Sequence, residues 1–471
     1  MNKNRFTTRW AFTPLLAALV LAGCSSVPAF EPVAAPAAPL AFKELEGRWA
    51  ALRPAESQAR GEWWKAFADP LLDELVARAD RNNTSIQLAA ARLAQARALV
   101  RTANANRMPQ LGWSGGANRQ SASPALGSTA PGTVFNARFG ATYEPDLFGR
   151  LAGVSSAAAL DAESREALMQ STRLLVQADV AQTYFGLRAL DAERALVRQT
   201  VVAYRDTLRL TESRYAAGDL AELDLARARA EVASNEAQAF ALDRRRAELE
   251  HALAVLIGEL PSSFTVSDGE WNGPLPQVPP GVPSAVLARR PDVAAAQRAM
   301  QAAQLRAGVA QTAWFPDVSL TASGGFASTD LSDLFKWSAR AWGVGALLSL
   351  PIFDGGRREA GVQSANAQWD AAAASYREQV LMAFRDVEDQ LSALRLLVDQ
   401  ANAQAQAVAA ATRSTVLSTS RYRNGYVSQL ELLDARRSEL RNRREALQVR
   451  AAQYQATVGL IRALGGGWGP Q

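Results

Sequence analysis

The stretch RYRNGYVSQLELLDAR, residues 421–436, is similar to the earlier stretch RYAAGDLAELDLARAR, residues 214–229. Each has a glycine four residues after its first arginine, Gly425 or Gly218, where the end of a helix favours a residue that tolerates positive φ. A second helix is expected to begin a few residues later in both. Each stretch is therefore predicted to be the tight turn of a helical hairpin.

The two stretches belong to one long repeat. Positions 425 and 218 differ by 207, and the same offset aligns Pro316 with Pro109 and Val387 with Val180. Solenoid repeats have periods of about 20 to 50 residues, so a repeat of this length indicates a duplicated half of a domain. The two turns are expected to lie side by side around a pseudo-twofold axis.

The chain begins with a segment typical of a secretory signal peptide. Basic residues precede an apolar run over residues 10–21, and Leu-Ala-Gly precedes Cys24. The run is shorter than the about 20 residues that span a bilayer as a helix. Residues 1–23 are therefore predicted to be removed and Cys24 to carry an N-acyl diglyceride. A buried thiol in an uncleaved leader is the alternative.

Composition excludes several classes of protein. Cys24 is the only cysteine, which rules out a disulfide framework and a cysteine-ligated metal site. Loss of the leader lowers the formal net charge from +5 to +2. Because the basic residues form no block with interleaved aromatic residues, no nucleic acid is expected as a partner.

Each half of the repeat contains one predicted β-hairpin, over residues 110–146 and 316–352. Apolar and polar residues alternate there with a period of two, as expected for strands with two different faces. Such strands suit an outer-membrane barrel, with apolar side chains toward lipid and polar ones toward a wet lumen. A soluble sandwich with one hydrated face is the alternative. Four strands are fewer than the about 8 of the smallest membrane barrels, so a barrel would require several chains.

Long helical patterns separate the hairpins. Ala, Leu, Arg and Gln recur at helical spacing over residues 70–107, 151–217, 219–257, 286–312, 357–424 and 427–464. The helices predicted at 151–217 and 357–424 would each be roughly 100 Å long. Rods of this length must bury their apolar stripes against neighbouring helices. The predicted fold is mixed α and β, a β-barrel continuous with a long α-helical barrel.

The same patterns suggest a division of the chain. It consists of a signal peptide (1–23), a lipid-anchored extended segment (24–61), a first repeat (62–260), a linker (261–283), a second repeat (284–464) and a C-terminal tail (465–471). The extended segment is rich in Pro and Ala and lacks periodicity, as expected for a tether from a lipid anchor.

Several motifs together resemble those of the TolC-like outer-membrane factors, which are outer membrane efflux proteins, in the NodT/OprM lipoprotein branch. They are Trp63-Trp64 with Asp69-Pro70, the segment YEPDLFGR at 143–150, its counterpart LPIFDGGR at 350–357, and both helical turns. The resemblance covers the mature chain from end to end.

This resemblance implies a function. Related proteins are homotrimers with a 12-stranded barrel in outer-membrane lipid and a long periplasmic α-helical barrel. They act as passive exit ducts of tripartite efflux pumps, with a periplasmic adaptor and an inner-membrane transporter, often of the RND type. A channel for type I secretion or metal efflux is the alternative within this family.

The resemblance also places a periplasmic gate at the repeated turn. Related channels narrow at the positions of Leu430, Glu431 and Asp434, and Arg437 lies beside them. Threefold symmetry would turn each position into a ring, and acidic rings favour cations. For Glu431, a capping box with Ser428 is an equally good explanation.

A second feature of the gate is a possible latch. Tyr422 and Asp224 fall where a hydrogen bond at the turn holds some relatives closed. The chain has Val427 where a latch arginine can occur, and Arg227 where the second repeat has Asp434. A full copy of that latch is therefore not expected.

Catalytic motifs are absent from the sequence. The single histidine, His251, lies in an Ala- and Leu-rich helical pattern, where it is expected to be a packed or solvated residue. No nucleophile elbow, phosphate-binding glycine loop or metal-ligand spacing is present. We therefore expect neither an enzyme nor a bound metal or cofactor. A periplasmic coiled-coil scaffold and, less favoured, a lipoprotein enzyme are the alternatives to a channel.

Overall fold

The computed structural model describes residues 42–45, 61–121, 131–269, 271, 273–278 and 289–466. The signal peptide, Cys24 and most of the predicted extended segment lie outside the described residues. So does the end of the tail. Contacts divide the chain into two compact units.

Both units combine segments from the two repeats. The sheet unit contains residues 92–166 and 295–377. The hairpin unit contains the described parts of 35–91, 167–294 and 378–471. The duplicated halves are therefore interleaved, and neither half forms a separate domain.

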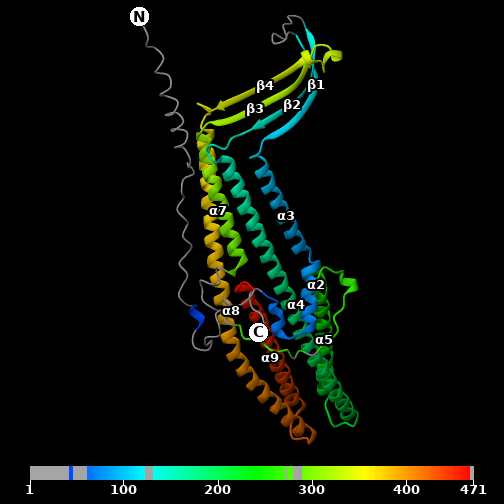
Figure 1. Ribbon diagram of the computed structural model, residues 1–471. Helices are drawn as coiled ribbons and strands as arrows, with labels where there is room; N and C mark the ends of the chain where they lie inside the picture. The colour runs from blue at the N-terminus through cyan, green and yellow to red at the C-terminus, as the bar shows by residue number, and fades with distance from the viewer. Residues whose placement is uncertain are drawn as a thin grey trace, which may run out of the picture. The chain divides into compact units, whose positions relative to one another are not determined.

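The sheet unit contains one antiparallel sheet with the strand order β1-β2-β3-β4 (Figure 1). The strands are β1 (Gln110–Gln120), β2 (Gly132–Tyr143), β3 (Asp317–Ser328) and β4 (Arg340–Ser349). The two predicted hairpins join through β2 and β3, where Ala141 lies opposite Ala322. One sheet thus spans both repeats, and the predicted hairpins are confirmed.

The strand register separates apolar from polar side chains. One side, here called the apolar sheet face, carries side chains that are each more than 60% exposed, namely Leu111, Trp113, Phe139, Trp342, Val344 and Leu348. The other side, the polar sheet face, carries mostly small or polar residues, such as Ser114, Asn136 and Arg138. The edge strands β1 and β4 each pair with only one neighbour in the described chain.

Parts of four helices belong to the sheet unit with the strands. They are the segments within residues 92–166 and 295–377 of α3 (Thr84–Ala105), α4 (Arg150–Ala216), α7 (Pro291–Gln311) and α8 (Arg357–Arg423). The Asp146 side chain caps the first turn of α4. Its carboxylate accepts the backbone amides of Leu151 at 3.1 Å and Ala152 at 2.6 Å. An ion pair between Arg298 and Glu163, at 3.1 Å, joins α7 to α4.

The hairpin unit contains two helical hairpins. The first joins α4 to α5 (Glu222–Leu256), and the second joins α8 to α9 (Gln429–Ala463). At their turns, Gly218 and Gly425 have φ values of 82° and 78°, in the left-handed region where glycine is favoured. Both predicted turns are therefore confirmed.

The helix predicted over residues 70–107 is wrong as a single helix. It is divided into α2 (Pro70–Asn82) and α3 at Asn83. The Asn83 Oδ1 accepts the backbone amides of Ser85 and Ile86, and its Nδ2 donates to the Leu256 carbonyl at 2.7 Å. A short polar side chain that bonds the backbone of the next turn favours a helix start over a helix interior.

In the second repeat a different residue makes the corresponding hydrogen bond to the end of a neighbouring helix. Arg290 is the counterpart of Asn83 and precedes α7, which begins at Pro291 within the predicted helix 286–312. Its guanidinium donates to the Ala463 carbonyl at 3.3 Å, and Ala463 is the counterpart of Leu256. Arg290 also pairs with Asp292 and Asp386, which compensate its buried charge.

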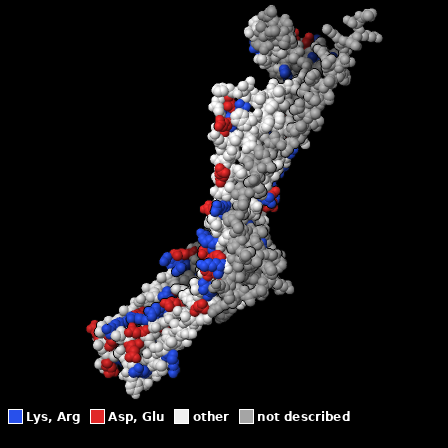
Figure 2. All heavy atoms as spheres, turned by 90° about the vertical axis from the view of Figure 1, so that its left-hand side faces the viewer, with Lys and Arg blue, Asp and Glu red and all other residues white. Residues whose placement is uncertain are grey.

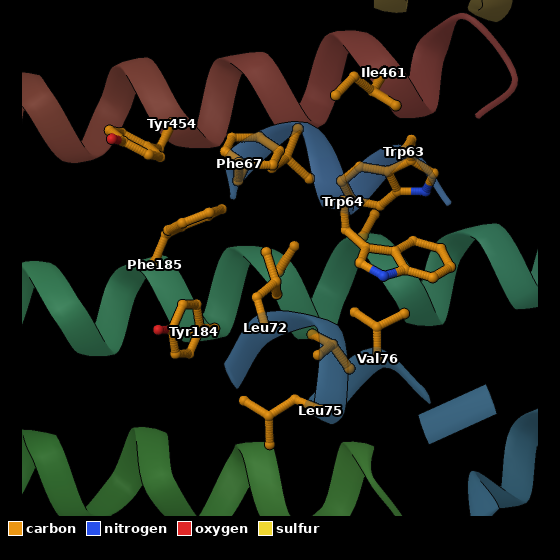
Figure 3. Close-up of a cluster of buried hydrophobic side chains, with 14 of the residues drawn as sticks. Trp63, Trp64, Phe67, Leu72, Leu75, Val76, Tyr184, Phe185, Tyr454 and Ile461 are labelled. Atoms are coloured by element: carbon orange, nitrogen blue, oxygen red, sulfur yellow. The ribbon is translucent and has the colours of Figure 1, made fainter. Parts of the chain in front are cut away.

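The core of the hairpin unit forms around a short 3₁₀ helix, η3 (Trp63–Phe67). Figure 3 shows η3 between α4 and α9, with aromatic side chains converging from all three elements. Ring centroids lie 4.8 Å apart for Phe67 and Phe185, and 4.7 Å apart for Phe185 and Tyr454. Trp63 is only 1% exposed. The Trp-Trp motif is therefore buried in the core, where η3 packs against α4 and α9.

Asp69 follows η3 and connects it to α2 and α4. Its Oδ1 accepts the backbone amides of Leu71 and Leu72 at the start of α2, and its Oδ2 accepts the Tyr184 hydroxyl at 2.6 Å. Burial, followed by the hydrogen bond to Asp69, raises the pKa of Tyr184 to about 12. The phenol thus remains a neutral donor at physiological pH.

We predict that Asp69→Ala lowers the free energy of unfolding by about 2 to 3 kcal/mol, because it removes a helix cap and leaves the Tyr184 hydroxyl without its acceptor. Tyr184→Phe should cost about 2 kcal/mol, because it removes both the donor to Asp69 and the acceptor of the Arg188 Nε–H. Thermal unfolding of the detergent-solubilised protein measures both. Glu74→Ala, at an exposed site on α2, serves as the control. Equal midpoints for Asp69→Ala and Glu74→Ala would contradict this role.

Candidate functional site

The turns of the two helical hairpins lie side by side, as expected from the repeat. We call residues 211–224 and 421–437 the paired tips. The Gln429 side chain donates to the Thr211 hydroxyl at 3.3 Å, and the Arg214 guanidinium lies 5.3 Å from the centroid of the Tyr422 ring. A hydrogen bond and a cation–π contact therefore join the two tips.

The structure does not contain the latch bond between Tyr422 and Asp224. Tyr422 is 4% exposed, and its hydroxyl has no hydrogen-bond partner among the described residues. Asp224 pairs instead with Arg227, one turn along α5, at 3.8 Å. The two residues therefore make separate contacts within the paired tips.

Ser428 and Glu431 form half of the capping box. The Ser428 hydroxyl accepts the backbone amide of Glu431 at 3.4 Å, so Ser428 caps α9. The Glu431 carboxylate does not return to the Ser428 amide, and it lies 3.7 Å from the Arg421 guanidinium. The Glu431 side chain is half exposed. Capping by Ser428 thus leaves the carboxylate of Glu431 available at the surface of the tip.

Leu430 and Asp434 lie on one side of α9, since they are four residues apart. Leu430 is 43% exposed, and the Asp434 side chain is 61% exposed. Arg437 reaches Asp434 at 3.4 Å but also donates to Glu231 on α5, whose side chain is only 13% exposed. Arg437 is therefore shared, and its contact with Glu231 joins the two hairpins.

The sequence analysis missed other residues that join the hairpins. Arg436 donates to the Ala203 carbonyl and to the Thr207 hydroxyl on α4, and burial lowers its pKa. Arg444 on α9 donates to Glu193 on α4 at 2.7 Å. These bonds hold α9 against the first hairpin over a long contact.

A comparison of the two repeats contains the signal for part of this contact. Ala230 and Ala237 are the counterparts of Arg437 and Arg444 at the offset of 207 positions. Where one half has arginine and the other has alanine, the arginine cannot serve a contact that both halves share. At these two positions the difference between the repeats coincides with a contact between the two hairpins.

Charged side chains gather on the hairpins. Figure 2 shows acidic and basic residues interleaved over the visible ends of the helical hairpins. In the described ranges no helix is long and apolar enough to cross a membrane. No group of three or more His, Cys, Asp or Glu residues in the described part of the chain could hold a metal ion.

The fold and the tips together define a class of protein. A sheet with one apolar and one polar face, joined to helices that end in paired polar tips, is the architecture of an outer-membrane channel subunit. The family model described as outer membrane efflux protein matches the chain twice, over residues 75–259 and 282–466. The chain belongs to this family, and the two matches correspond to the two repeats.

Individual relatives agree with this assignment. The chain is 33% identical over 467 residues to the solvent efflux pump outer membrane protein SrpC of Pseudomonas putida, covering 97% of this chain and 98% of SrpC. It is 30% identical over 463 residues to the cation efflux system protein CusC of Escherichia coli K12, covering 96% and 98%. The crystal structure of the CmeC outer membrane channel of Campylobacter jejuni matches with a TM-score of 0.88 and 25% identity, covering 94% and 95%.

The protein is therefore an outer-membrane channel of a tripartite efflux pump, located in the outer membrane. Its family consists of transport channels. The predicted family, fold class and location are confirmed. Membership of this family implies a trimer, an adaptor and an inner-membrane transporter.

We predict that Asp434→Ala weakens block of the channel by trivalent cations, because Asp434 is exposed at the tip and shares Arg437 with Glu231. Single-channel recordings in planar bilayers measure the block. Glu248→Ala, at an exposed position far along α5 from the tip, is the control and should be blocked like the parent. Unchanged block in Asp434→Ala would show that no acidic ring forms there.

Proposed function

We propose that three copies of the chain close their sheets into one 12-stranded barrel. The observation that supports this most directly is the incomplete sheet. Among the described residues, β1 and β4 each have one unpaired edge, and the apolar sheet face is exposed. Unpaired edge groups and apolar surface are both costly unless strands and lipid cover them. Four strands cannot close a barrel, whereas threefold repetition gives twelve.

The barrel so formed is proposed to be a passive exit duct. The polar sheet face would line its lumen with small or polar side chains, which hold no large ligand tightly. The driving force would come from an inner-membrane transporter of the RND type, through a periplasmic adaptor, and the chain itself would catalyse no reaction. Since the names of relatives include solvent and cation efflux, we propose small molecules as the cargo class.

The paired tips are proposed to be the periplasmic gate. Threefold symmetry would place Leu430, Glu431 and Asp434 in successive rings, with Arg437 holding α9 against Glu231 of the first hairpin. Opening would then require that the contacts between hairpins rearrange. The unpartnered hydroxyl of Tyr422 supports this proposal, because a different packing, including one with Asp224, could give it a partner.

We predict that Phe139→Arg prevents assembly of the trimer. An arginine on the lipid side of a barrel costs about 2 to 4 kcal/mol at mid-bilayer, and threefold symmetry repeats this cost. The matched control is Asn136→Arg, which puts the same residue on the polar sheet face of the same strand. Gels of boiled and unboiled detergent extracts report the SDS-resistant trimer. Normal trimer yield from Phe139→Arg would contradict the proposed barrel.

A further prediction concerns the lipid anchor, for which we propose acylation of Cys24. Cys24→Ser should abolish acylation, while the barrel still inserts, because closed strands bury far more apolar area than one anchor. Metabolic labelling with palmitate and fractionation of membranes measure the two effects. A labelled Cys24→Ser variant would refute the site, and an exported, folded variant absent from the outer membrane would refute insertion without the anchor.

A further inference from the structure

The apolar sheet face has an arginine at one end of each edge strand. Arg119 lies on β1 and Arg340 on β4, both in register with that face, since Arg119 is opposite Thr133 and Arg340 is opposite Phe326. They are its only charged residues within the four strands. Both lie at the end of the sheet where the hairpin connections are, away from the ends that join the helices (Figure 1).

The opposite end of the same face carries no charged residue within the four strands. Leu111 on β1 and Leu348 on β4 lie there, each eight residues from the arginine of its strand. Eight residues extend about 26 Å along a strand, or about 20 Å in height at the usual tilt of a barrel strand. An apolar band of a membrane barrel is about 25 Å tall. Both arginines would therefore lie at one boundary of the hydrocarbon, and no cation on this face lies at the other.

Aromatic residues surround Arg340 as they do at a membrane interface. Its Nε donates to the Trp337 carbonyl at 2.9 Å, and its guanidinium lies over the Trp337 ring, which is 75% exposed. Phe335 is 72% exposed and contacts Phe326 on the apolar sheet face, with ring centroids 5.6 Å apart. Exposed Trp and Phe rings are typical of the headgroup level of a bilayer.

The two arginines also lack carboxylate partners among the described residues. No ion pair among the described residues involves Arg119 or Arg340, whereas Lys336 is neutralised by Asp333 at 2.6 Å. The connection after Arg119, residues 120–131, contains no Asp or Glu in its sequence. A guanidinium at the edge of hydrocarbon needs an anion that reaches it from the membrane or from solvent.

We propose that Arg119 and Arg340 form a binding site for the headgroup phosphates of outer-leaflet lipid. This inference rests on the proposed trimeric barrel, in which β1 of one copy meets β4 of the next. Each seam would then bring one Arg119 and one Arg340 to the same rim, and like charges on neighbouring strands repel each other. A phosphate between them removes the repulsion, because its oxygens match the donor fork of arginine. Threefold symmetry gives three such sites.

The test uses purified trimers of the full chain in detergent, with diphosphoryl lipid A added as the probe. Native mass spectrometry counts the lipid molecules that each trimer retains. An arginine near a charged lipid surface contributes about 1 kcal/mol, so Arg119→Gln with Arg340→Gln should weaken lipid binding about 30-fold, and each single variant about fivefold. The matched control, Arg138→Gln, removes an arginine from the polar sheet face and should bind lipid like the parent.

Three results would overturn the site. They are equal retention by the parent and the double variant, equal retention of a dephosphorylated lipid A, and displacement of the lipid by inorganic phosphate alone, which would indicate a site for free anions. If the double variant does not assemble, the single variants decide by the same measurement. Absence of an SDS-resistant trimer in the parent would instead refute the barrel, and with it this inference. Retention lost only in the rim variants, on intact trimers, supports it.

Discussion

The structure depends on one constraint, namely that a four-stranded sheet with two free edges cannot satisfy its own backbone. Every N–H and C=O at an outer edge must find a strand, because hydrocarbon offers no water to replace one. The exposed side chains of the apolar sheet face must likewise be shielded from water. A trimer closed into a barrel would meet both needs, because β1 of one copy would pair with β4 of the next and lipid would cover the apolar sheet face.

Because the chain is duplicated, the same structural feature occurs twice, and different side chains form it in the two repeats. Asn83 and Arg290 make the same joint to the end of a neighbouring helix, one with a neutral amide and the other with a buried cation. The amide also caps α3, whereas the cation requires Asp292 and Asp386. Where the halves differ most, as at Arg437 and its counterpart Ala230, the difference creates a contact between the hairpins. Divergence between the repeats thus supplies Asp434 and Arg437 of the candidate gate, whereas Leu430 has an identical counterpart in Leu223.

Most of the elements could be predicted from apolar periodicity. The strands and the two long helices begin and end near the expected residues, because each pattern reflects which face of an element is covered. The division at Asn83 was missed, since the helical pattern continues on both sides of it. At the tips, Ser428 was foreseen as a cap because capping acts over three residues, whereas the surroundings of Tyr422 depend on the approach of Arg214 from the other hairpin.

The sequence by itself determined the duplication, the strands with their two faces, the helical hairpins and the family, because these follow from spacing and from motifs read locally along the chain. Only the tertiary structure decided which side chains meet across the hairpins. The bond from Arg437 to Glu231 joins residues 206 positions apart, and the bond from Asn83 to Leu256 joins residues 173 positions apart. No local pattern contains such pairs, since they form only when packed helices bring distant polar groups within hydrogen-bond distance.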